Sequence, residues 1–152
     1  MLPEISAKRF LVVDDMPEMV ETVADMLRHY GIRDILRANG AETALAVLRA
    51  ERKLDCVISD FNMGQFNGLE MLSLVRSGGC IGIPRDQRFI LLTGHGEAEV
   101  VRTALALDVN GYIVKPVALK TLIQAVERAF NRAINLKTTR EYQAIKAIKA
   151  PT

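Results

Sequence analysis

Five short apolar runs, each rich in β-forming residues, alternate along this sequence with segments of helical periodicity. The runs are Phe10–Asp14, Asp34–Ala38, Asp55–Ser59, Phe89–Leu92 and Gly111–Val114. After each run, apolar residues recur every three or four positions, as they do on one face of a helix. Strands that alternate strictly with helices build parallel sheets, and continuous apolar strands suit burial on both faces. The pattern therefore predicts an α/β fold, a doubly wound (βα)5 architecture with a five-stranded parallel sheet and helices on both faces.

The length of 152 residues suits one domain, which we place at residues 1–132, followed by an extension at 133–152 that forms no separate domain. No apolar run approaches the roughly 18 residues that a membrane span needs. The N-terminus lacks the charged-then-apolar layout of a secretory signal. Cys56 and Cys80 have no CxxC partner and no nearby histidine, which disfavours disulfide and zinc sites. We therefore expect a cytoplasmic protein that does not associate with membranes.

Residues 131–152 hold five basic residues and one acidic residue. A basic tail could meet nucleic acid or an acidic partner, but a solvated, partly helical extension is the interpretation that we favour. Direct DNA binding is not expected, because the extension is too short for a helix-turn-helix or winged-helix module. The chain is therefore expected to be a stand-alone domain or a domain cut from a longer protein.

The absence of Gly and Pro between residues 131 and 150 permits one long helix that continues from Ala118–Phe130. Thr138 and Thr139 argue against it, because β-branched residues are poor in the middle of a helix. In such a helix an apolar stripe could meet a partner or a second copy of the chain. The stripe consists of Ile134, Tyr142, Ile145 and Ile148.

Reactive side chains follow four of the five predicted strands. Asp14 and Asp15 come at the end of the first run, Asp60 after the third, Thr93 after the fourth and Lys115 after the fifth. The carboxyl ends of parallel strands meet at one edge of a sheet, where ligands bind in such folds. Three carboxylates gathered there would repel one another, and a hard divalent cation such as Mg²⁺ removes that repulsion. A carboxylate can also accept a phosphoryl group, with a metal ion and a lysine stabilising the transferred charge.

Each of these residues also has an ordinary structural interpretation. An Asp at a strand end is more often a cap or turn residue than a reactive group. Lys115 could be an exposed turn lysine, and Thr93 could cap the helix that begins near Glu97. The functional interpretation is stronger for the set, because complementary roles converge on one edge of the sheet.

Four sequence blocks, FLVVDD, VISDFNMGQFNG, ILLTG and GYIVKP, resemble the signature blocks of response-regulator receiver domains, the CheY-like family. The resemblance covers about Lys8 to Arg132 and implies a flavodoxin-like fold. It implies that Asp60 is the phosphoacceptor and that Mg²⁺, with Mn²⁺ as an alternative, is the cofactor. Asp60 and Asp15 would bind the metal ion directly, with Asp14 acting through a metal-bound water. The backbone carbonyl of Asn62 would complete the protein ligands.

The same resemblance assigns the groups around the phosphoryl. Thr93, Lys115 and the backbone N–H of Gly94 would bind its oxygens. Thr93 and Tyr112 would act as switch residues that remodel the face made by the domain's fourth helix, fifth strand and fifth helix; without the family, Tyr112 is an ordinary strand residue. Asn62 and His95 occupy positions that tune the phosphoryl lifetime, although His95 could equally be an exposed loop histidine. Gly64 departs from the family, which usually has Pro at this place.

Two functions from different classes follow. The first is a phosphorylation-activated signalling switch of a two-component system. It would receive phosphoryl from a sensor histidine kinase or phosphotransfer protein, then act on an unknown downstream protein or dimerise through the fourth and fifth helices or the C-terminal helix. The second is a Mg²⁺-dependent phosphohydrolase with an aspartyl-phosphate intermediate. That class typically has a second Asp two residues after the nucleophile as general acid, where this sequence has Asn62. We therefore favour the switch, a protein that is not an enzyme beyond its own phosphorylation and autodephosphorylation.

Overall fold

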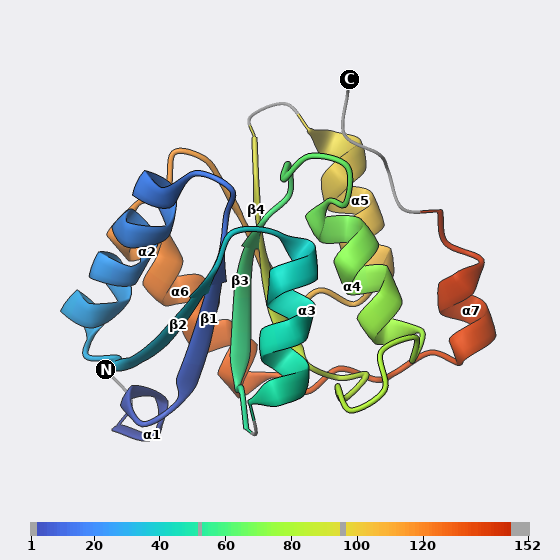
Figure 1. Cartoon of the computed structure of the whole chain (residues 1–152), viewed down its shortest axis with the longest axis horizontal. Helices are drawn as coiled ribbons and strands as arrows, with labels where there is room; N and C mark the ends of the chain where they lie inside the picture. The colour runs from blue at the N-terminus through green and yellow to red at the C-terminus, as the bar shows by residue number, and fades with distance from the viewer. Residues whose placement is uncertain (1–2, 52, 95–96, 147–152) are drawn as a thin grey trace.

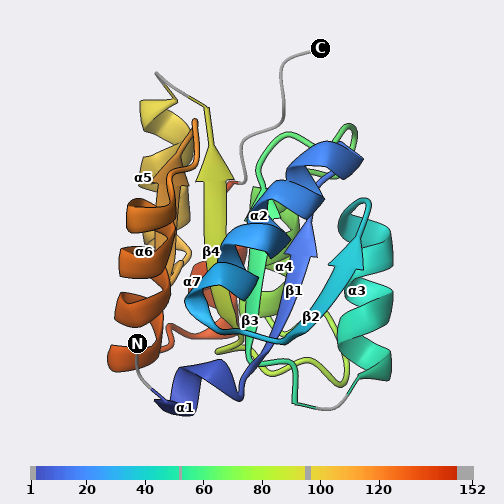
Figure 2. The ribbon, with the colours of Figure 1, turned by 90° about the vertical axis from the view of Figure 1, so that its left-hand side faces the viewer.

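The structure, a computed structural model, describes residues 3–51, 53–94 and 97–146. Within these residues five strands form one sheet, in the spatial order β2-β1-β3-β4-β5, and all neighbouring strands run parallel. The strands are Arg9–Val13 (β1), Asp34–Ala38 (β2), Cys56–Asp60 (β3), Arg88–Thr93 (β4) and Gly111–Val114 (β5). Figure 2 shows the arrowheads of β1, β2 and β4 pointing to the same edge of the sheet. The predicted parallel sheet is confirmed.

Helices cover both faces of this sheet (Figure 1). They are Pro3–Ser6 (α1), Pro17–Tyr30 (α2), Ala41–Ala50 (α3), Gly68–Arg76 (α4), Ala98–Ala106 (α5), Leu119–Asn131 (α6) and Thr139–Gln143 (α7). α2 and α6 lie on one face, and α3, α4 and α5 lie on the other (Figure 1). The doubly wound fold is confirmed; because α1 precedes β1 and was not predicted, the predicted fourth and fifth helices are α5 and α6.

Burial on both faces explains the continuous apolar strands. All five residues of β3 are buried, and so are the last four of β1. In β1, Phe10 and Val12 contribute to the core beneath α2 and α6, whereas Leu11 and Val13 contribute to the core beneath α3, α4 and α5. Successive side chains of a strand point to opposite faces. A strand between two helical layers therefore needs apolar residues at every position.

Short-range signals fix the helix that follows β1. Pro17 occupies the first turn of α2, where its missing N–H costs no hydrogen bond. Gly31 ends the helix with φ +113°, and its N–H donates to the carbonyls of Leu27 and Arg28. This left-handed conformation favours glycine. Pro17 and Gly31 therefore define both ends of α2, which begins four residues after β1 ends.

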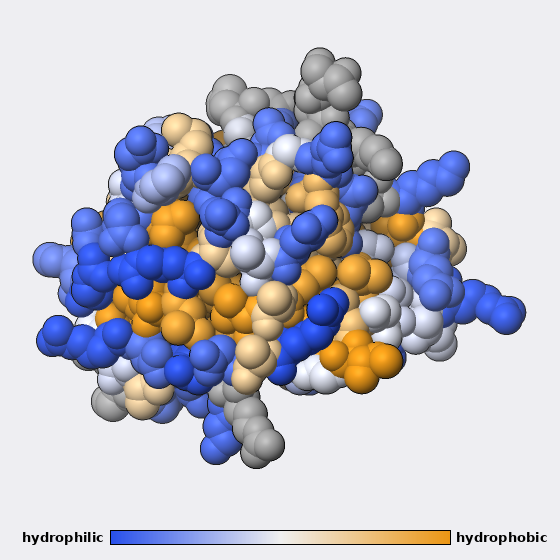
Figure 3. Space-filling view, viewed as in Figure 1, coloured by the Kyte–Doolittle hydropathy of each residue, from blue (hydrophilic) through white to orange (hydrophobic). Residues whose placement is uncertain are grey.

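One of the two edge strands of the sheet is β2, which is flanked by ion pairs. Arg37 donates to Glu21 at 2.6 Å, and Arg9 donates to Asp34 at 2.9 Å. Figure 3 shows an apolar band across this view of the molecule, with hydrophilic side chains above and below it. Charged side chains beside an edge strand disfavour pairing with a strand of another molecule.

The long C-terminal helix that the sequence permits is absent from the described residues. α6 ends at Asn131, because Arg132 adopts an extended conformation. In Figure 1 the chain then runs below the sheet to α7, beside α4. Thr138, which argues against a long helix, accepts a hydrogen bond from the N–H of Glu141 and caps α7. Thr138 is therefore a helix start rather than a position within a helix.

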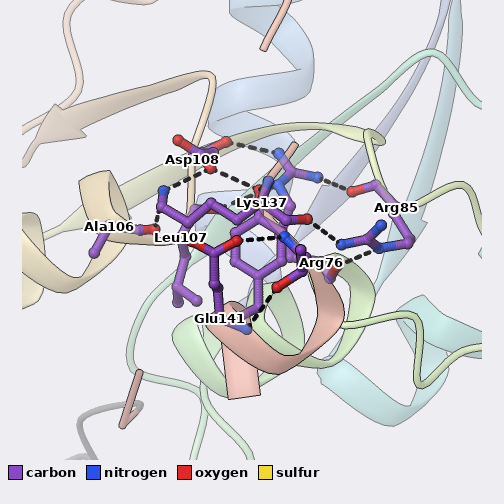
Figure 4. A network of polar contacts seen from close by, with 9 residues as sticks. Arg76, Arg85, Ala106, Leu107, Asp108, Lys137 and Glu141 are labelled. Atoms are coloured by element: carbon purple, nitrogen blue, oxygen red, sulfur yellow. Dashed lines mark hydrogen bonds and ion pairs between the residues drawn. The ribbon is translucent and has the colours of Figure 1, made fainter. Parts of the chain in front are cut away.

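The extension contacts its own domain through Tyr142, whose side chain is fully buried. The Tyr142 hydroxyl donates to Asp108 at 2.6 Å, and the Lys137 ammonium also binds Asp108, at 2.8 Å. Arg85 donates to the backbone carbonyl of Lys137 at 2.6 Å (Figure 4). The prediction that Tyr142 belongs to a stripe free to meet a partner is wrong, since it packs inside this chain. Ile145 packs against the same core, and Ile148 lies outside the described residues.

Beneath this contact lies Arg76, the last residue of α4, which is fully buried. Its guanidinium donates five hydrogen bonds, to the backbone carbonyls of Arg85, Gln87, Leu107 and Asp108 and to the side-chain oxygen of Asn110. An arginine side chain has five N–H donors, so every donor is used. Burial lowers its pKa to about 10. Arg76 thus joins α4, the segment before β4 and the end of α5 (Figure 4).

Candidate functional site

Three carboxylates meet at the carboxyl edge of the sheet. Asp14 and Asp15 follow β1, and Asp60 is the last residue of β3, the neighbouring strand. One oxygen from each carboxylate lies within 4.8 Å of the others. Asp14 and Asp60 are buried, whereas Asp15 is exposed. The structure therefore brings together the three acids that the sequence singles out.

Asp14 has one satisfied oxygen and one unsatisfied oxygen. Its Oδ1 accepts a hydrogen bond from the backbone N–H of Met16 at 2.9 Å. Among the described residues, Oδ2 is buried without a hydrogen-bond partner. Burial raises the pKa of Asp14 from 3.8 to about 6, and the neighbouring Asp60 adds to this. An orphaned buried carboxylate oxygen is costly unless a cation or a proton binds it.

Asp60 is paired with the one lysine predicted for this edge. Lys115, directly after β5, places its ammonium nitrogen 2.6 Å from Asp60 Oδ1. The Asp60 side chain is 7% exposed and that of Lys115 is 30% exposed, so the pair opens to solvent on the lysine side. Burial raises the pKa of Asp60, and the hydrogen bond and charge of Lys115 oppose that shift. Lys115 therefore stabilises the ionised form of Asp60, which is the form that can act as a nucleophile.

The backbone behind Asp60 requires a glycine at Gly68. A Cβ atom at Gly68 would lie 2.6 Å from the backbone carbonyl oxygen of Asp60. The Gly68 N–H also donates to the carbonyl of Phe61 at 2.9 Å. Any side chain at this first residue of α4 would displace the strand end that carries Asp60. Gly68 thus fixes the position of the acid.

On the other side of Asp60, two hydrogen-bond donors lie at the carboxyl end of β4. Thr93 is buried, and its hydroxyl donates to Glu97 Oε2 at 2.6 Å. The backbone N–H of Gly94 donates to the same oxygen at 2.7 Å. Thr93 lies beside the other site residues because β4 pairs with β3 and its carbonyl accepts the N–H of Lys115. The edge thus combines an acidic half and a half rich in donors.

Comparison with known proteins decides the family. Residues 10–127 match the family model of the response regulator receiver domain. The chain belongs to the response-regulator receiver family. Chemotaxis protein CheY1 of Helicobacter pylori is 35% identical over 125 residues, which cover 78% of this chain and 94% of that protein. CheY-3 of Vibrio cholerae is 30% identical over 124 residues, which cover 82% of this chain and 92% of that protein.

A solved structure agrees with this assignment. A receiver domain protein from Clostridium thermocellum superposes with a TM-score of 0.73 at 26% identity, covering 82% of this chain and 94% of that chain. The flavodoxin-like (βα)5 fold and the CheY-like resemblance are therefore confirmed. Receivers of this family are signalling proteins of two-component systems, switched by phosphorylation, and are not enzymes in the ordinary sense.

The remaining receiver positions lie in different surroundings. Asn62 is exposed in the loop after β3. Gly64, in the same loop, has φ +90°, a conformation closed to the proline that the family usually has there. Tyr112 lies on β5 and is 42% exposed. His95 lies outside the described residues, so its assignment remains a prediction.

The acidic half of the site fits a hard divalent cation. It offers three carboxylates within reach of one another, of which one has an orphaned buried oxygen. Oxygen ligands of this kind suit Mg²⁺, which prefers carboxylates and retained waters. Asp14, Asp15 and Asp60 are therefore the residues that would hold it.

Two residues of this receiver site are not predicted by the sequence patterns. Gly68 reads as the end of a glycine-containing loop, and only the close approach of the Asp60 carbonyl reveals its role. Glu97 reads as the start of a helix, and its carboxylate reaches back four residues to Thr93. A general rule could have suggested both, since glycines often mark close backbone approaches and acids favour helix N-termini. Neither rule identifies the partner.

Across the described part of this receiver, no helix is both long enough and apolar enough to cross a membrane.

Proposed function

We propose that this receiver takes a phosphoryl group on Asp60 from a sensor histidine kinase or a phosphotransfer protein, with Mg²⁺ or Mn²⁺ as cofactor. Asp15, Asp60 and the backbone carbonyl of Asn62 would bind the cation, and Asp14 would act through a bound water. A cytoplasmic location and one receiver domain at residues 1–132 belong to the same proposal. The observation that supports it best is a buried Asp60 held by Lys115 beside two further carboxylates.

The transfer step uses the ionised Asp60 as nucleophile. A carboxylate oxygen of Asp60 attacks the phosphorus of a phosphohistidine, the P–N bond breaks, and its electron pair leaves with the imidazole ring. Lys115, the Thr93 hydroxyl and the Gly94 N–H would then bind the phosphoryl oxygens. The cation supplies positive charge that offsets the developing negative charge. Asn62 and His95 would set how readily water reaches the product.

The output surface would be the face formed by α5, β5 and α6. It carries a cavity of about 530 Å³ that is lined by residues including Leu105, Tyr112, Val114 and Arg128. Leu105, Tyr112 and Val114 are each at least 42% exposed. Movement of Thr93 toward the phosphoryl, with Tyr112 turning inward, would reshape this face. The occupant is a downstream protein or a second copy of the chain.

The phosphohydrolase alternative predicts different turnover. With p-nitrophenyl phosphate and Mg²⁺, the switch should release less than about one nitrophenolate per protein per minute, whereas an enzyme would typically turn over at about 1 s⁻¹ or faster. The physical reason is that Asn62, at the general-acid position, cannot donate a proton. The measurement is continuous absorbance, with Asn62→Asp as a comparison variant. Enzyme-like turnover by the wild type would contradict the switch.

Mg²⁺ is expected to raise the melting temperature more at about pH 7.5 than at about pH 5. The pKa of Asp14, raised from 3.8 to about 6, leaves this residue mostly protonated at the lower pH. Without metal, a raised pKa means that the folded state holds this proton more tightly than the unfolded state. The resulting stabilisation is present below pH 3.8 and is lost as the pH rises through about 6.

Cation binding to the ionised carboxylate opposes that loss. An affinity about tenfold lower at the acidic pH corresponds to about 1.4 kcal/mol less stabilisation at saturating metal. Differential scanning fluorimetry with and without MgCl₂ measures the shift, and Asp15→Ala should show a smaller one at both pH values. A shift that is equal in wild type and Asp15→Ala would rule out Asp15 as a ligand.

A further inference from the structure

In the donor-rich half of the site, the carboxylate of Glu97 already takes the place of a ligand. Its Oε2 accepts from the Thr93 hydroxyl at 2.6 Å and from the Gly94 N–H at 2.7 Å. Lys115 lies 2.6 Å from Asp60. All three donors that the proposed function assigns to the phosphoryl oxygens are therefore held by carboxylates of the chain itself. A single oxygen of Glu97 lies where two of these donors converge, as a phosphoryl oxygen would.

Helix capping does not account for this geometry. Glu97 is the N-cap residue of α5, with φ −92° and ψ 59°, yet in the part of the chain that the structure describes its side chain makes no capping bond to that helix. The N-cap residue of α4 behaves differently, because Asn67 accepts a hydrogen bond from the N–H of Glu70 in its own helix. The carboxylate of Glu97 is instead directed back to the end of β4.

Glu97 and a phosphoryl group cannot use these donors together. A threonine hydroxyl carries one proton and a backbone amide carries one, so each can serve one anion at full strength. The distances to Glu97 are short, as in hydrogen bonds to charged acceptors. A phosphoryl group on Asp60 would also bring about two negative charges into the site and repel the Glu97 carboxylate. Glu97 is half-buried and can reach solvent by rotating away.

We propose that Glu97 is a positioning residue that imitates the phosphoryl group in the unphosphorylated receiver, and that phosphorylation of Asp60 displaces it. Glu97 holds Thr93 and Gly94 in place and competes with the phosphoryl oxygens for them. Because α5 begins at the next residue, its displacement frees the start of the helix that borders the output surface. This inference rests on the proposed function of Asp60.

The test is calorimetric titration with beryllofluoride and Mg²⁺, since beryllofluoride on a carboxylate imitates a phosphoryl group. Glu97→Ala should bind it about tenfold more tightly than the wild type, because the competing anion is lost. Glu97→Asp keeps the charge but is one methylene shorter and cannot serve both donors equally, so an intermediate gain is expected. Glu99→Gln is the matched control: it removes one charge from an exposed position of the same helix and should change affinity less than twofold.

A second measurement separates positioning from a structural role. In the ligand-free protein, the amide proton of Gly94 should move upfield in the nuclear magnetic resonance spectrum of Glu97→Ala, because its bond to a charged acceptor is lost. The same resonance should move little in Glu99→Gln. If Glu97→Ala does not fold, Glu97→Asp provides both measurements.

The outcomes distinguish failure of the Glu97 inference from failure of the phosphoacceptor assignment of Asp60. Tighter beryllofluoride binding in the Glu97 variants, with Glu99→Gln unchanged, supports the inference. Unchanged or weaker binding by folded Glu97 variants overturns it and makes Glu97 a residue that organises the turn. If the wild type does not bind beryllofluoride, or if Asp60→Asn binds it as tightly as the wild type, the phosphoacceptor assignment itself is overturned, and the inference falls with it.

Discussion

Replacing Arg76 with methionine is expected to lower the free energy of unfolding by about 3–5 kcal/mol, because several buried acceptors would lose their donor at once. Arg76 is fully buried and donates to four backbone carbonyls and one side-chain oxygen. Replacing a whole buried ion pair by apolar residues can be neutral. Here the acceptors are mostly backbone groups that no substitution removes, so the cost remains.

Urea unfolding followed by circular dichroism measures this loss. Arg102→Met is the matched control, since Arg102 is exposed on α5 and a surface substitution of this kind changes stability by about 0.5 kcal/mol or less. Arg76→Lys should fall between the two, because lysine has three donors in place of five. If Arg76→Met unfolds at the same urea concentration as Arg102→Met, the network of Figure 4 contributes no stability.

The strands could be predicted from the sequence because a strand that is buried on both faces appears as a continuous run of apolar residues. Two strands match the predicted runs at both ends, β2 and β5. β1 and β3 each begin and end one residue away from the prediction. At β3 the reason is visible: Asp55 accepts a hydrogen bond from the backbone N–H of Arg9 through its side chain and precedes the first ladder residue, Cys56. Such shifts depend on the neighbouring strand, which a single strand sequence does not contain.

The convergence of the acids could also be predicted, because the fold alone brings the strand ends together. The prediction that three acids meet required only the order of the elements and the position of each acid at the end of an apolar run. These acids are Asp14, Asp15 and Asp60. Glu97 could not be found in this way, because its partners depend on the path of the turn after β4. A periodic pattern describes which face of a helix is apolar, but it contains no information about a side chain that leaves the helix.

The path of the C-terminal extension also could not be predicted from the sequence, because it depends on contacts between distant residues. Its composition permits a helix through residues 131–150, with no Gly or Pro to stop it. In the structure Arg132 is extended and no helix forms in the described residues between it and Thr139, and tertiary contacts of Lys137 and Tyr142 with Asp108 hold this segment against the domain. Tertiary contacts routinely override local helix preference. Those contacts join residues about 30 positions apart, so the sequence around either residue does not predict them.

Asp60→Asn is expected to abolish covalent phosphorylation while leaving the fold intact. The side-chain amide is a poor nucleophile and cannot form the aspartyl phosphate. The substitution also removes the ion pair with Lys115, but that lysine is partly exposed and can be solvated. Loss of one carboxylate relieves repulsion against Asp14, so the melting temperature should stay equal or rise. Circular dichroism checks that the variant is folded.

The most direct measurement is intact-mass spectrometry after incubation with acetyl phosphate and MgCl₂, on the wild type and on Asp60→Asn side by side. The wild type should gain the mass of one phosphoryl group, the gain should require Mg²⁺, and folded Asp60→Asn should gain nothing. The same gain in Asp60→Asn, or no gain in a wild type that demonstrably binds both Mg²⁺ and acetyl phosphate, would contradict a phosphorylated switch centred on Asp60.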